Sequence, residues 1–263
     1  MKTRTSHGIA AALSTVAILA GTASQVYATE AQQTVAKQTD SAATPAAYAK
    51  YLRHSHEEGA ADALKQFQHL TRAEQNKFIG YLHDPALLKS LFDKSADQGN
   101  GVSAYARNTS STTSLRNGDV IFGQERTISN LSTRASRPLP SGNHTVTYTA
   151  YMKLFGVKVI KLNLSVNFRI SGGDITKANY AEASKKNLSG VITLSHDRPK
   201  KSLGTWEYCT LHPTRCHHGH HANASVIWEG SIAFRGSNFQ IDKKQYMVAN
   251  NYGEVIDYYL HNV

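Results

Sequence analysis

Apolar and polar residues alternate over long stretches of the C-terminal half of the chain. Every second residue from 146 to 154 is apolar, and after a Phe-Gly pair the alternation resumes from 160 to 170. A period of two residues is typical of strands that bury one face. We therefore predict a hairpin of two long strands over residues 144–171.

A second strong strand signal runs from residue 222 to 234, where seven alternate positions carry no charge. Weaker strand signals lie around residues 119–122, 190–194, 205–209, 245–249 and 255–260. The chain has no long helical pattern between these segments, and such a pattern is what a parallel sheet needs. Residues 118–263 are therefore predicted to form an antiparallel β-sandwich or open barrel.

The apolar period lengthens to three or four residues between positions 44 and 94, where four stripes predict four short helices. Helix start signals precede the stripes at Thr44-Pro45, Ser55 with Glu58, Thr71 with Glu74, and Asp84-Pro85. A unit of about 50 residues is marginal by itself, so we expect it to pack against the rest of the chain. The predicted fold class is α+β, with a small helical segment followed by a β domain.

Two further segments contain too few large apolar residues to build a core. Residues 29–43 are mainly Gln, Thr, Ala and Ser, and this composition predicts a disordered lead. Residues 95–117 are rich in Ser, Thr, Asn and Gly, and are predicted to be a linker between the helical segment and the β domain.

The first 28 residues have the three parts of a secretory signal peptide. Lys2 and Arg4 precede an uncharged run from residue 8 to 20, and the triplet 26–28 places small residues where a signal peptidase accepts them. The run is shorter than the roughly 20 residues that a bilayer requires, so we expect no transmembrane anchor. The sequence predicts a secreted protein, of bacterial type, that is cleaved after Ala28.

The chain has 29 Lys and Arg against 19 Asp and Glu, and the excess lies in the predicted β domain. Residues 29–100 carry 8 basic and 9 acidic side chains, whereas residues 101–263 carry 19 and 10. This asymmetry favours attachment to an anionic envelope polymer, a lipid surface or a partner protein, with nucleic acid an unlikely partner outside a cell. Positive charge also serves solubility alone. The candidate polyanion contacts are Lys153, Lys158, Lys161, Arg169, Lys200, Lys201 and Arg215.

The only two cysteines, Cys209 and Cys216, bracket a short segment that contains a proline. In an exported protein this spacing is most simply a disulfide that closes a small loop. Five histidines lie in and beside the same segment, at His212, His217, His218, His220 and His221. Imidazole is the commonest metal ligand, so weak binding of Zn or Cu is a second interpretation, although no cofactor is required.

The sequence contains no P-loop, no HExxH zinc helix and no GxSxG nucleophile elbow. The preferred hypothesis is therefore an exported binding protein without enzymatic activity. Two alternatives remain open at this stage. One is a membrane-active antibacterial or pore-forming protein that inserts the 144–171 hairpin, and the other is a metal-dependent hydrolase at residues 212–221.

Overall fold

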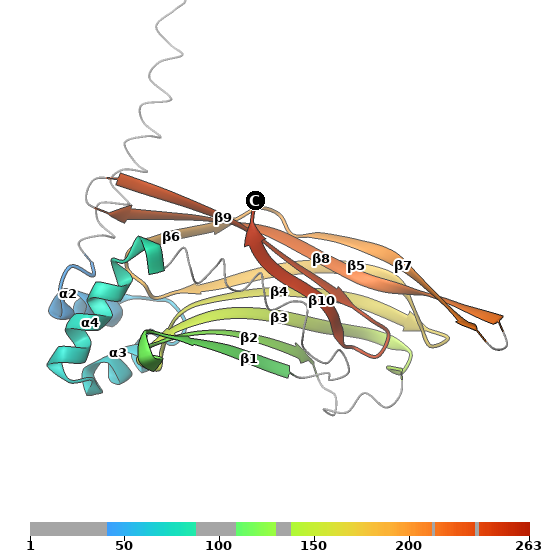
Figure 1. Cartoon of the computed structure of the whole chain (residues 1–263), viewed down its shortest axis with the longest axis horizontal. Coiled ribbons are helices and arrows are strands. Elements are labelled where there is room, and N and C mark those ends of the chain that lie inside the picture. The colour runs from blue at the N-terminus through green and yellow to red at the C-terminus, as the bar shows by residue number, and fades with distance from the viewer. Residues whose placement is uncertain (1–40, 88–108, 130–137, 212–213, 235–236) are drawn as a thin grey trace, which may run out of the picture.

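A computed structural model describes residues 41–87, 109–129, 138–211, 214–234 and 237–263. It has helices on the N-terminal side and two antiparallel five-stranded sheets (Figure 1). The α+β class is therefore confirmed. The predicted signal peptide, most of the lead and most of the fourth predicted helix lie outside the described residues.

Three predicted helices are present, as α2 (Pro45–His54), α3 (Ala60–His69) and α4 (Arg72–Leu82). Thr44 caps α2, and Thr71 forms the expected capping box with Glu74 at the start of α4. The predicted capping box of Ser55 with Glu58 is wrong. Helix α3 begins after Gly59, whose φ of 74° suits glycine, and the Ser55 hydroxyl accepts a hydrogen bond from the Glu57 N–H instead.

The first sheet contains five strands that follow one another in space as they do in the sequence. They are β1 (Thr109–Leu115), β2 (Val120–Ile128), β3 (Gly142–Leu154), β4 (Val157–Ser171) and β5 (Asp174–Asn187). The predicted long hairpin is β3 with β4, and it turns at Phe155 and Gly156, which both have positive φ.

The second sheet has the order β10-β9-β8-β6, and β7 also pairs with β8. Its strands are β6 (Ile192–His196), β7 (Lys200–Leu211), β8 (Thr214–Phe234), β9 (Ser237–Ala249) and β10 (Val255–Asn262). Strand β8 is long enough that β7 pairs with its first half and β6 with its last residues. Every weaker strand signal therefore overlaps a strand of the structure, although β2 begins at Val120 and β6 at Ile192.

The prediction of a linker over residues 95–117 is wrong at its C-terminal end. Residues Thr109–Leu115 form strand β1, which pairs with β2 along its whole length, and the short 3-10 turn η2 (Arg116–Gly118) joins them. Threonine fits a pleated strand, and an edge strand needs few apolar side chains. The sheet therefore begins at residue 109 and not at 118.

The helices and both sheets share one apolar core. Tyr48, Phe67 and Phe78 pack against one another in the helical part, and the Tyr48 hydroxyl donates to the Leu188 carbonyl oxygen at 2.7 Å. Between the sheets, the rings of Tyr148 and Tyr258 meet at 5.1 Å. The helices gather at one end of the sheets, and the β7–β8 hairpin extends from the other end (Figure 1).

None of the helices that the structure describes is long and apolar enough to cross a membrane.

Candidate functional site: a lysine cluster on the outer face of the first sheet

Four lysines gather on the outer face of the first sheet, near its helical end. The strand register places Lys161 beside Tyr151 on β3 and Lys186 on β5, and it pairs Lys153 with Lys158 across the β3–β4 hairpin. We call Lys153, Lys158, Lys161 and Lys186 the lysine cluster. Three of its members are predicted contact residues that the register brings together. Lys186 was not predicted.

Tyr151 lies at the centre of the lysine cluster. Its ring covers Gly123 on β2 so closely that a Cβ atom at this glycine would come within 2.0 Å of the ring. The ammonium groups of Lys158 and Lys153 lie 4.3 Å and 5.2 Å from the ring centroid. An aromatic ring attracts a cation at such distances, so Tyr151 holds two like charges near each other.

The lysine cluster has little negative charge to balance it. Among the described residues, Glu125 is the only carboxylate that forms an ion pair with the cluster, at 4.0 Å from Lys158. Burial lowers the pKa of Lys158, the neighbouring Lys161, Lys153 and Lys186 lower it further, and Glu125 opposes them. This face therefore carries a surplus of positive charge that the fold holds in place.

Hydrogen-bonding side chains continue along the same face from the lysine cluster, and all are neutral except Glu182, which the register places opposite Ser165. The Thr149 hydroxyl donates to Asn163, whose amide donates to Ser184, and Thr147 bonds with Ser165. We call this set, with the similar bonds of Asn167 to Thr145 and of Asn179 to Asn167, the hydroxyl-amide network. It ends near Arg169, which the register pairs with Lys177 and Asn143.

The remaining predicted contact residues lie apart from the cluster. Arg169 is eight residues from Lys161 along β4, or about 26 Å at a strand rise of roughly 3.3 Å per residue. Lys200 and Lys201 belong to β7 in the second sheet, where the Lys201 ammonium donates to the Ala178 carbonyl oxygen on β5 at 2.6 Å. Arg215 is opposite Thr210 in the β7–β8 hairpin.

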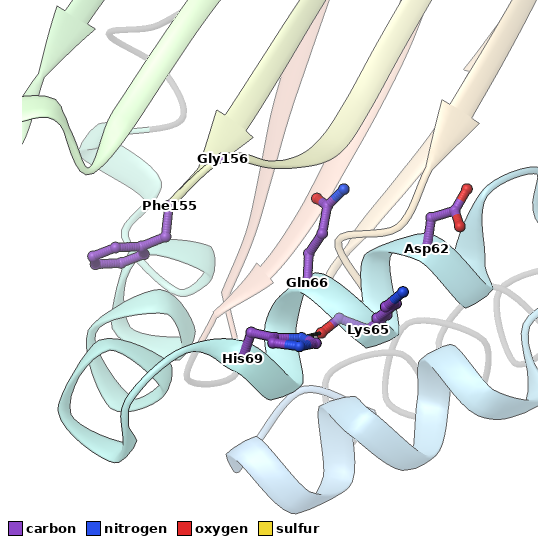
Figure 2. A pocket seen from close by; sticks show the side chains of 6 residues that line it. All are labelled: Asp62, Lys65, Gln66, His69, Phe155 and Gly156. Atoms are coloured by element: carbon purple, nitrogen blue, oxygen red, sulfur yellow. Dashed lines mark hydrogen bonds between the residues drawn. The ribbon is translucent and has the colours of Figure 1, made fainter.

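A groove adjoins the lysine cluster at the β3–β4 turn. It has a volume of about 580 Å³ and is lined by Asp62, Lys65, Gln66, His69, Phe155 and Gly156. Figure 2 shows that Asp62 and Gln66 point from α3 toward the side on which the turn lies. The groove mixes both signs of charge with one aromatic ring. It could not be predicted from the sequence because α3 and the turn are far apart in the chain.

The two cysteines are direct neighbours across the β7–β8 hairpin, because Cys209 on β7 is opposite Cys216 on β8. Opposed residues in antiparallel strands have Cα atoms roughly 4.5 to 5.5 Å apart, a separation that a disulfide spans. The register is thus compatible with the disulfide, which stays a prediction.

Three of the five histidines, His218, His220 and His221, are divided between the two faces of the same hairpin. His220 and His218 face a carboxylate each, with Nδ1 at 2.7 Å from Asp174 and 3.7 Å from Glu207 respectively. His221 lies on the opposite face and stacks on Trp206, where burial lowers its pKa. No group of three or more His, Cys, Asp or Glu that could hold a metal ion occurs among the described residues. His212 lies outside them, and weak metal binding stays a prediction.

The sequence matches no protein-family model, and it has no match among curated proteins or solved structures.

Proposed function

We propose that this protein is an exported binding protein whose lysine cluster attaches to an anionic polymer. The observation that carries this proposal is the concentration of four lysines around Tyr151, with one carboxylate, Glu125, paired to them among the described residues. Like charges that a fold holds together raise the local concentration of anions of opposite sign. The predicted signal peptide supports an encounter with envelope or surface polymers.

A polymer fits the outer face better than a small anion does. The hydroxyl-amide network leads from the lysine cluster to Arg169 and Lys177, so basic groups lie at both ends of a track that is neutral except for Glu182, opposite Ser165. An extended chain with regularly spaced acidic groups would meet cations at both ends and hydrogen-bonding side chains between them. An acidic polysaccharide or a polyphosphate-type wall polymer has this chemistry.

Two features of the fold underlie the proposal. We infer that the sheets form a β-sandwich rather than an open barrel, because they pack face to face and no described strand belongs to both. We also infer that Cys209 and Cys216 form a disulfide in the exported protein. Both features would keep the outer face rigid while a polymer binds.

The two alternative functions have less support. Insertion of the 144–171 hairpin into a membrane would require β3 to leave β2 and β4 to leave β5, with the loss of two complete strand pairings. A hydrolase at residues 212–221 would require convergent metal ligands, and the described histidines lie on opposite faces of the hairpin.

The proposal is tested by binding isotherms with polyphosphate, polygalacturonate and neutral dextran. The test variant replaces Lys153, Lys158, Lys161 and Lys186 with Gln. The control variant makes the same charge change at exposed residues elsewhere, Lys50, Arg53, Arg72 and Arg198. We expect the test variant to lose at least tenfold in affinity for a polyanion and the control to lose less than threefold, with no binding to dextran. Equal losses in both variants would mean that only net charge matters, and would refute the site.

A further inference from the structure

A row of polar side chains crosses the inner face of the first sheet near its edge. The register aligns Thr109 on the edge strand β1 with Arg126 on β2 and with Tyr148 on β3. Tyr258 meets them from β10, which is an edge strand of the second sheet. The four side chains thus come from four strands, at the side where the two sheets end.

The Tyr258 ring contacts two other side chains of this row. The Arg126 guanidinium lies 4.5 Å from the centroid of the Tyr258 ring, and that ring meets the Tyr148 ring edge to face at 5.1 Å. Arg126, Tyr148 and Tyr258 are 4%, 0% and 3% exposed. Gln245 on β9 also contacts the row, because its side-chain amide donates to the Tyr148 carbonyl oxygen at 3.1 Å.

The polar atoms at the ends of these side chains are buried and lack partners. Thr109 Oγ1, Arg126 Nη2 and the hydroxyls of Tyr148 and Tyr258 form no hydrogen bond with any residue that the structure describes. The described residues also include no carboxylate in ion-pair contact with Arg126. Folded proteins pair nearly all their buried polar atoms, and they rarely bury a charge without a counter-charge. Four such atoms on one row of aligned positions indicate that a ligand binds there.

We propose that Arg126, Tyr148, Tyr258 and Thr109 form a binding site for a small oxyanion, a carboxylate or phosphate group. A guanidinium offers paired N–H donors that match the two oxygens of such a group, and the three hydroxyls supply further donors. The Tyr258 ring holds the guanidinium in place. This oxyanion site is independent of the polymer-binding proposal, because it lies on the inner face of the sheet and the lysine cluster lies on the outer face.

The test compares thermal unfolding with acetate, inorganic phosphate and chloride at one fixed ionic strength. It is done in the background that already carries the four Lys→Gln changes, so that anions bound at the lysine cluster do not contribute. Arg126→Gln removes the charge, and Tyr258→Phe removes one hydroxyl but keeps the ring. Tyr246→Phe and Arg198→Gln are the matched controls at positions away from the row.

We expect acetate or phosphate to raise the unfolding midpoint by about 4 °C more than chloride does. Arg126→Gln should abolish this increment, Tyr258→Phe should at least halve it, and both controls should keep it. The anion with the larger effect identifies the ligand as a carboxylate or a phosphate. Without added oxyanion, Arg126→Gln should unfold at the same temperature as its parent or a higher one, since it removes an uncompensated buried charge.

The proposal fails if neither oxyanion exceeds chloride, or if Tyr258→Phe and Arg126→Gln keep the full increment. If Arg126→Gln does not fold, Tyr258→Phe and Tyr148→Phe decide the question, because both keep the aromatic packing and differ from the parent only in a donor.

Discussion

The ring of Phe155 stacks on the ring of Tyr81, with centroids 5.9 Å apart and planes 19° apart. Phe155 is in the β3–β4 turn and has a φ of 47°, an uncommon conformation for a bulky residue. The Tyr81 hydroxyl also donates to Asp119 at 2.8 Å. Tyr81 therefore joins helix α4 to the β3–β4 turn and to the β1–β2 turn. The positive φ of Phe155 places its ring in contact with Tyr81.

We expect the helices and the sheets to unfold together because of this contact and the shared core. Tyr81→Phe should lower the free energy of unfolding by about 1.5 to 3 kcal/mol, since it removes a hydrogen bond to a charged group. Urea unfolding followed by circular dichroism and by tryptophan fluorescence measures it. Two separate transitions in the parent protein would contradict the single core.

Replacement of Gly123 by Ala should disturb the lysine cluster. The added Cβ would come within 2.0 Å of the Tyr151 ring, which must move away from Lys153 and Lys158. We expect a loss of about 1 to 3 kcal/mol in stability, together with weaker polyanion binding. Gly80→Ala is the control, because nothing lies within 4 Å of its added Cβ and a helix favours alanine. If Gly123→Ala left polyanion binding unchanged, the position of the Tyr151 ring would not matter for binding.

The sequence pattern was sufficient for the regularly alternating strands β3 and β4 and for residues 222–234 of β8, but not for the first part of β8, which begins at Thr214. It failed at β5, where register shifts opposite Asn167 and Arg169 break the alternation, and Ala, Lys and Glu resemble a helical composition. It failed at β1 because that strand is almost entirely Ser and Thr. Lys186 could not be predicted as a member of the cluster because β5 was not predicted, and only the register of β5 places Lys186 beside Lys161.

Contacts between distant parts of the chain also could not be predicted from the sequence. Asp174 and His220 are 46 residues apart, yet the carboxylate accepts hydrogen bonds from both the ring and the backbone N–H of His220. Nothing in the local pattern around either residue indicates this pair. The same holds for Arg126 and Tyr258, which come from different sheets.

The Asp174–His220 contact should make the stability of the β7–β8 hairpin depend on pH. Burial raises the pKa of Asp174, but hydrogen bonds from the His220 ring and backbone and from Ile175 bring it below its ordinary value. A lowered carboxyl pKa stabilises the fold above about pH 4, and that contribution disappears as the pH falls through the pKa of the folded state.

We therefore expect Asp174→Asn to lower the free energy of unfolding by at most about 1 kcal/mol at pH 7, since the pair is partly exposed. The difference from the parent should shrink below pH 4. Urea midpoints at pH 7 and pH 3 measure it, with the exposed Asp257→Asn as the control. A difference that persists at pH 3 would show that the ionised carboxylate is not responsible.

The cysteine pair leads to a prediction about the exported protein. We expect it to begin at Thr29 and to react with no alkylating agent until it is reduced. Reduction should cost roughly 2 to 3 kcal/mol, because a disulfide across so short a loop restricts the unfolded chain only modestly. Intact mass before and after alkylation decides the matter. Two alkylated thiols without reduction would exclude the bridge.

The most direct measurement of the central claim is the salt dependence of polyphosphate binding. Each cation that contacts a polyanion releases counterions, so the logarithm of the binding constant falls with the logarithm of the salt concentration by roughly 0.7 to 0.9 per contact. We expect the quadruple Lys153, Lys158, Lys161 and Lys186→Gln variant to have a slope shallower than the parent's by about 3, and the charge-matched control to keep the parent slope. A quadruple variant with the parent slope would contradict the claim that the lysine cluster is the binding site.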